Sequence, residues 1–79
     1  MNQNVLGSLK PGERGTVVKI NLQGNLRKRV LEMGLVPGVE FEVKGKAPLG
    51  DPLEIALKGY RLSLRREEAN GILVEGEKL

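Results

Sequence analysis

The sequence predicts a mainly β protein with one short helix, closed into a small barrel. Short runs of alternating apolar and polar residues recur along the chain, Gly and Pro separate these runs, and one segment has helical spacing. A sheet of short strands leaves open edges, and small all-β proteins remove them by curling the sheet. An SH3-like barrel is the simplest architecture that fits. The chain has 79 residues, so we expect a single domain over residues 1–79, with a core from about 6 to 75.

Five segments are predicted to be strands because their apolar residues alternate with polar ones or are β-branched. Gly59 lies between two such segments and predicts a tight hairpin. The last strand is expected to be followed by a frayed tail over residues 76–79. The five segments are residues 16–20, 39–46, 53–58, 60–65 and 72–75.

One short helix is predicted to begin at Asn25 and to end at Gly34. The Asn25 side chain can accept hydrogen bonds from N–H groups of the first turn. Gly34 can adopt the left-handed backbone conformation that a Cβ penalises. A single further helical turn is expected over residues 66–71. The apolar residues on one face of the helix are Leu26, Val30 and Met33.

The chain contains neither Cys nor His, which limits its chemistry severely. Disulfides, thiolate nucleophiles, imidazole bases and the common zinc, copper and haem sites are all excluded. Carboxylates remain, and they suit hard ions or a weak ferrous interaction, which stays open. No phosphate-binding Gly-x4-Gly-Lys-Ser/Thr loop occurs. The pair Glu67 and Glu68 is interpreted as a solubilising surface feature, so we expect no enzyme, no catalytic residue, no cofactor and no built metal site.

The lack of Cys and the absence of long apolar runs predict a cytoplasmic protein, and the charge of the chain permits a charged partner. The net charge is +3, and five basic residues but no acidic one occur between Arg14 and Leu31. Such a charge permits attraction to acidic proteins, nucleic acid or anionic lipid, and it does not distinguish these three partner classes. No segment is apolar enough to cross a membrane, and the first residues do not resemble a signal peptide.

Four stretches, in order and suitably spaced, resemble the FeoA family of bacterial ferrous iron transport proteins. The resemblance runs from about Leu9 to Val74. It also extends to the C-terminal domain of DtxR-type iron-dependent repressors, but this chain shows no DNA-binding helix-turn-helix and no His or Cys site. The stretches are Leu9-Lys-Pro-Gly-Glu, Arg29-Val-Leu-Glu-Met-Gly-Leu-Val-Pro-Gly, Ala47-Pro-Leu-Gly-Asp-Pro-Leu and Gly59-Tyr-Arg-Leu-Ser-Leu-Arg-Arg-Glu-Glu-Ala.

The resemblance implies an SH3-like fold and a role beside FeoB, the membrane transporter that imports ferrous iron. The expected partner region is the cytoplasmic G-protein domain of FeoB, and the expected function is accessory or regulatory. The alternative is a small basic nucleic-acid-binding module. Only Phe41 and Tyr60 are aromatic, which leaves no platform for base stacking, so no nucleic acid is expected. An exposed edge strand leaves a homo-oligomer open.

Three groups of residues are candidates for partner binding, and each has a purely structural alternative. The helical basic cluster is alternatively a solvated helix face. Leu49 alternatively closes one end of the barrel while Asp51 caps a turn. The arginines of the last hairpin alternatively pair across strands with Glu40, Glu42 or Glu54. The candidates are Arg27, Lys28 and Arg29; Leu49 and Asp51; and Arg61, Arg65 and Arg66.

Overall fold

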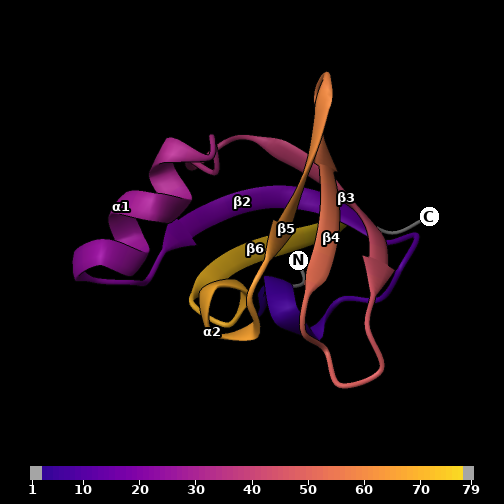
Figure 1. Ribbon diagram of the computed structural model, residues 1–79. Helices are drawn as coiled ribbons and strands as arrows, with labels where there is room; N and C mark the ends of the chain where they lie inside the picture. The colour runs from indigo at the N-terminus through magenta and orange to yellow at the C-terminus, as the bar shows by residue number, and fades with distance from the viewer. Residues whose placement is uncertain (1–2, 78–79) are drawn as a thin grey trace.

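The computed structural model describes residues 3–77, and its six strands form one antiparallel sheet. The strand order across the sheet is β1-β6-β2-β3-β4-β5 (Figure 1). The mainly β class is therefore confirmed, with two short α-helices and a 3₁₀ turn. The elements are β1 (Gln3–Val5), η1 (Leu6–Ser8), β2 (Arg14–Ile20), α1 (Gly24–Glu32), β3 (Glu40–Lys46), β4 (Leu53–Leu57), β5 (Tyr60–Leu64), α2 (Arg66–Ala69) and β6 (Ile72–Glu77).

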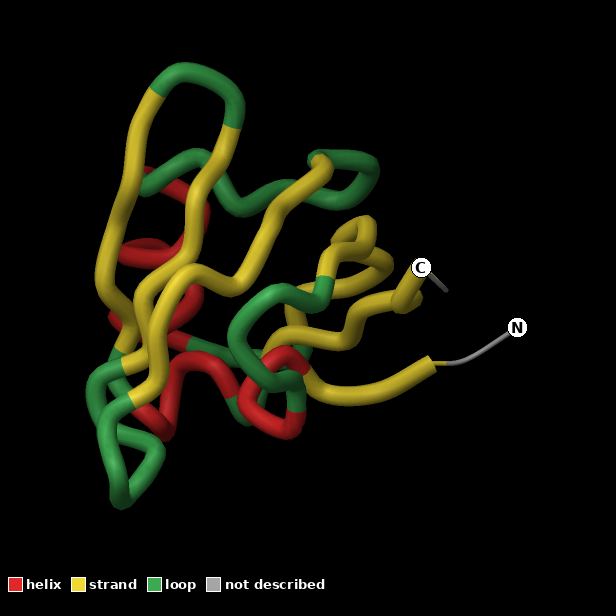
Figure 2. The backbone as a smooth tube through the Cα atoms, turned by 90° about the vertical axis from the view of Figure 1, so that its right-hand side faces the viewer, coloured by secondary structure: helices red, strands yellow, loops and turns green. Residues whose placement is uncertain are grey.

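The sheet bends strongly, so that β3, β4 and β5 lie across β2 and β6 rather than beside them in one plane (Figures 1 and 2). Two register shifts accompany the bend. One lies in β2 between Val17 and Lys19, and the other in β3 between Val43 and Gly45. An extra residue in one strand of a pair bends that strand and increases its twist. These irregularities help to curl the short sheet around its core.

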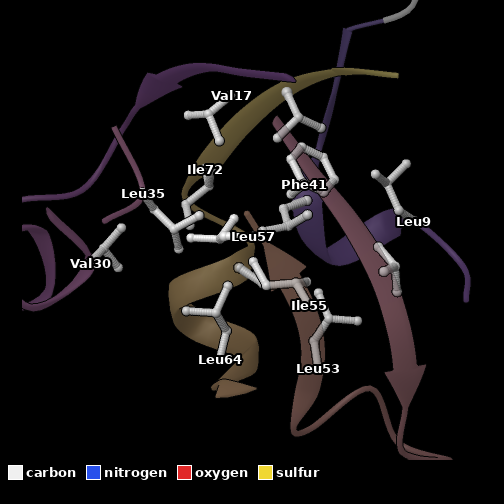
Figure 3. Close-up of a cluster of buried hydrophobic side chains, with 14 of the residues drawn as sticks. Leu9, Val17, Val30, Leu35, Phe41, Leu53, Ile55, Leu57, Leu64 and Ile72 are labelled. Atoms are coloured by element: carbon white, nitrogen blue, oxygen red, sulfur yellow. The ribbon is translucent and has the colours of Figure 1, made fainter. Parts of the chain in front are cut away.

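The core consists of the inward-facing residues of the alternating strands, together with residues from the helices and turns (Figure 3). Val30 of α1 is buried and Met33 packs against the core, as the helical spacing predicts, whereas Leu26, the third residue of the predicted face, is only partly buried and lies outside this cluster. Burying one such aliphatic side chain contributes about 1.5–3 kcal/mol, so the set dominates the stability of the chain. The buried residues include Val17, Ile20, Leu35, Phe41, Val43, Leu53, Ile55, Leu57, Leu64, Ile72 and Val74.

Strand β1 and the end of β6 were not predicted from the pattern. The three residues of β1 are exposed and show no alternation, because this strand is held by antiparallel pairing with β6 rather than by burial. The frayed tail predicted from Gly76 is wrong as far as Glu77, because Gly76 lies opposite Gly15 of β2 and Glu77 lies opposite Arg14. The rest of that predicted tail, residues 78–79, lies outside the described residues.

The helix α1 ends as predicted but begins differently. Its N-cap is Gln23, which makes no side-chain capping hydrogen bond, and Asn25 already lies inside the first turn, so the predicted Asn25 cap is wrong. Gly34 has a φ of +98°, which confirms the left-handed ending. The Tyr60 hydroxyl donates a hydrogen bond of 2.7 Å to the Met33 carbonyl at this end. None of the described helices is long and apolar enough to span a membrane.

Candidate partner interface

A buried carboxylate of α2 forms an ion pair with an arginine of α1. Glu68 of α2 is completely buried. Its Oε1 atom accepts a hydrogen bond of 2.9 Å from the Arg65 N–H, while its own N–H donates to the Arg65 carbonyl. Its Oε2 atom lies 2.9 Å from Nε of Arg29 on α1. The interpretation of Glu68 as a solubilising surface residue is therefore wrong.

The contact between Arg29 and Glu68 is an ion pair rather than an aligned hydrogen bond. Oε2 has no hydrogen-bond partner among the described residues. A buried carboxylate is costly unless a positive charge or hydrogen bonds compensate it, so the guanidinium is needed to neutralise this oxygen. Arg29 itself is about half exposed. A glutamate three residues into a helix is a capping signal in the sequence, but only the tertiary structure shows that Glu68 is buried and lies beside Arg29.

The three basic residues predicted on the helix have different surroundings. Nη1 of Arg27 donates a hydrogen bond of 2.8 Å to the Ile20 carbonyl, which attaches the first turns of α1 to the end of β2. Arg29 is held by Glu68. Lys28 is exposed. Two of these cations therefore have structural contacts. All three are exposed, so each contributes to the positive electrostatic potential of this surface.

The arginines of the last hairpin do not form the predicted cross-strand ion pairs. Arg61 lies opposite Ala56 of β4, and Ser63 lies opposite Glu54. No described carboxylate side chain lies within 4.0 Å of Arg61 or Arg65. Cross-strand pairing is set by register, and this register places an alanine opposite the cation. The carboxylates that the alternative interpretation named were Glu40, Glu42 and Glu54.

The remaining hairpin arginine, Arg66, is the first residue of α2 and is exposed. Arg65 precedes it as the N-cap and is exposed as well. Together with Arg61 these residues form what we call the hairpin arginine group. The group runs along β5 and into the first turn of α2.

Leu49 is the most exposed large apolar residue described, with 81% of its surface accessible. The interpretation that it closes one end of the barrel is therefore wrong. Its loop is held by backbone hydrogen bonds, from the Gly50 N–H to the Ala47 carbonyl and from the Ala47 N–H to the Pro52 carbonyl. Asp51 is exposed beside it.

The structure does not bring the loop and the hairpin tip together. The Leu49 loop precedes β4, whereas the hairpin turn follows it, so the two lie at opposite ends of that strand. Two further exposed apolar residues were not among the predicted candidates, namely Tyr60 at the start of β5, 48% accessible, and Val36 between α1 and β3, 43% accessible. A tyrosine directly after a Gly turn was the available sequence signal for Tyr60.

An open depression lies over β3 and β4, with Phe41 and Leu57 among its lining residues. Its lining carries charges of both signs. Arg14 and Lys58 are positive, and Glu40 and Glu42 are negative. This mixed lining selects no ligand charge. Within residues 3–77 no group of three or more potential metal-ligating side chains was found.

Comparison with known proteins assigns the chain to a family. The family model described as the FeoA domain matches residues 5–76. The chain belongs to the FeoA family. Among curated proteins, it is 43% identical over 70 residues to the Fe(2+) transport protein A/Fe(2+) transporter FeoB fusion protein of Porphyromonas gingivalis. The match covers 89% of this chain but only 8% of that much longer relative.

Two solved structures show that the fold is the SH3-like one predicted. The FeoA of Stenotrophomonas maltophilia, described as a procaryotic SH3 domain protein in complex with zinc, has a TM-score of 0.77 and 29% identity, covering 92% of this chain and 94% of that one. IdeR of T. acidophilum has a TM-score of 0.86 at 17% identity, covering 98% of this chain and 35% of that one. The second likeness concerns the fold alone, and it agrees with the predicted resemblance to a repressor domain.

Proposed function

We propose that this FeoA-family chain is a cytoplasmic accessory protein of ferrous iron uptake that docks on the G-protein region of a FeoB-type transporter. The observation that carries the proposal is the relative in which a similar segment and FeoB are named as one fusion protein. Fusion keeps two modules at a high effective concentration. Separate chains must instead find each other through complementary surfaces.

The proposed role is binding rather than catalysis. Neither His nor Cys is available as a base, nucleophile or metal ligand, so iron is proposed to be the cargo of the transporter and not a resident of this chain. The net charge of +3 favours association with an acidic surface. Leu49 supplies an exposed apolar anchor, and the hairpin arginine group, with Lys28, supplies the charge.

The proposal is tested by calorimetric titration of the protein into the isolated G-protein region of the cognate transporter, with GDP and with a GTP analogue. Saturable binding supports docking, and a nucleotide preference identifies the state that is regulated. An absence of heat with both nucleotides refutes docking on this region. A steeply salt-dependent affinity for RNA or DNA would instead favour the nucleic-acid alternative.

Two pairs of variants locate the surface in the same titration. Arg66→Glu is expected to weaken binding about tenfold or more, whereas Lys10→Glu makes the same charge change between η1 and β2 and should have little effect. Leu49→Ser is expected to weaken binding similarly, with Val5→Ser as the control at another exposed apolar residue. Equal effects within a pair would contradict the assignment of that residue.

A further inference from the structure

The outer edge of β5 is an open strand edge with a defined set of backbone groups. Among the described strands, β5 pairs only with β4 and ends the sheet. Leu57 and Tyr60 face each other across a turn of two residues, and Gly59 within that turn has a φ of +90°. The projecting hairpin is visible at the top of Figure 1.

The turn determines which backbone groups of β5 point outwards. In a hairpin with a two-residue turn, the closing pair exchanges hydrogen bonds, and hydrogen-bonded pairs then alternate with non-bonded pairs along the strands. Tyr60, Leu62 and Leu64 therefore direct their N–H and C=O groups towards β4. Arg61 and Ser63 direct theirs away from the sheet, where a further strand would lie.

The arginine side chains on this edge of the strand have no described carboxylate partner. Arg61 and Ser63 are exposed and share one face of the strand, which Arg65 continues. No described carboxylate side chain lies within 4.0 Å of either arginine. Tyr60 adds an exposed aromatic surface at the start of the strand, fixed by its hydrogen bond to Met33.

This charge pattern disfavours pairing of β5 with a second copy of itself. An antiparallel copy must pair Arg61 with Arg61, Arg61 with Ser63, or Ser63 with Ser63 to use the outward backbone groups. In each of these registers an arginine of one copy lies directly or diagonally opposite an arginine of the other. Like charges in such positions destabilise a strand pair.

We propose that the outer edge of β5 is a strand-addition site for an extended acidic segment of a partner protein. A segment with acidic side chains at alternate residues places them on the same face as Arg61 and Arg65. The backbone of that segment pairs with Arg61 and Ser63, and cross-strand ion pairs select its charge. The proposal specifies the chemistry of the segment, and it does not depend on the partner being an iron transporter.

The direct test uses two synthetic octapeptides with blocked ends and NMR spectroscopy of the isotopically labelled full chain. One peptide alternates glutamate with valine and threonine, and the other replaces each glutamate by lysine. The acidic peptide is expected to shift the amide signals of Arg61 and Ser63, to slow their hydrogen exchange, and to bind at least about tenfold more tightly than the basic peptide. Unchanged signals of both amides up to about 5 mM acidic peptide overturn the proposal.

A proline variant separates strand addition from simple attraction between opposite charges. Ser63→Pro removes an outward N–H, and proline is tolerated at an edge position of this kind. It is expected to weaken binding of the acidic peptide about tenfold. Lys58→Pro places proline in the same hairpin at the first turn position, where proline is favoured, and should change binding by less than about twofold. Equal affinities for Ser63→Pro and the unmodified chain overturn the proposal.

A side-chain variant provides a second measurement if Ser63→Pro does not fold. Arg61→Glu is expected to reverse the preference between the two peptides, whereas Arg61→Lys should retain it. An unreversed preference overturns the proposal. Sedimentation analysis of the unmodified chain completes the test, because self-association that Ser63→Pro abolishes would show that a second copy occupies the edge.

Discussion

Replacing Arg29 by methionine removes the positive charge that lies 2.9 Å from the buried Glu68 carboxylate. Methionine keeps most of the aliphatic length of the side chain, so the change is mainly electrostatic. The hydrogen bond from the Arg65 N–H to Oε1 remains, but Oε2 loses its counter-charge. Breaking a fully buried ion pair costs about 3–5 kcal/mol.

The expected cost here is smaller because Arg29 is 52% exposed and water partly screens the pair. We expect a loss of about 2 kcal/mol in the free energy of unfolding. For a domain of this size that loss lowers the melting temperature by about 8–16 °C. Thermal unfolding followed by circular dichroism measures it. Lys28→Met is the control, since the neighbouring lysine is exposed, and it should change the free energy by less than about 0.5 kcal/mol.

A double-mutant cycle identifies the cause of the loss. Glu68→Gln keeps an oxygen acceptor for the Arg65 N–H and removes the buried charge. Once the charge is absent, Arg29→Met should cost about 1 kcal/mol less than it does in the unmodified chain. Equal costs of Arg29→Met in the two backgrounds, or a melting temperature no lower than that of Lys28→Met, refute the electrostatic reasoning.

Two pairs of glycine substitutions test the close approaches in the fold by thermal unfolding. Gly34 and Gly12 both have left-handed φ values, of +98° and +93°, but only at Gly34 would a Cβ overlap the Tyr60 hydroxyl. Gly34→Ala should therefore cost about 1 kcal/mol more than Gly12→Ala, because a hydrogen bond is lost as well. Gly15 and Gly76 are paired across β2 and β6, and a Cβ on Gly15 would overlap the Glu75 carbonyl, whereas one on Gly76 meets only an atom at 3.9 Å. Gly15→Ala should destabilise by about 2–3 kcal/mol and Gly76→Ala by less than about 0.5 kcal/mol, so similar melting temperatures would contradict the packing of these strands.

Local patterns in the sequence predicted those features that depend on neighbouring residues. Alternation identified the buried faces of β3 and β4, because successive side chains of a strand point to opposite sides. Gly34 marked the end of α1, because its backbone conformation is unfavourable for other residues. The four family stretches were also recognisable without a structure. The lack of Cys and His alone excluded whole classes of chemistry for this chain.

Other features were decided only by the tertiary structure, because they depend on which distant segments meet. Strand β1 is formed by pairing with β6, and its three exposed residues carry no pattern of their own. Glu68 is buried in the folded chain, where Arg29 from a distant segment neutralises it. The register of β4 and β5 placed Ala56 opposite Arg61, so that the expected ion pair did not form. A sequence specifies the charge of a residue, but the free energy of that charge depends on the water and the partners that the fold leaves around it.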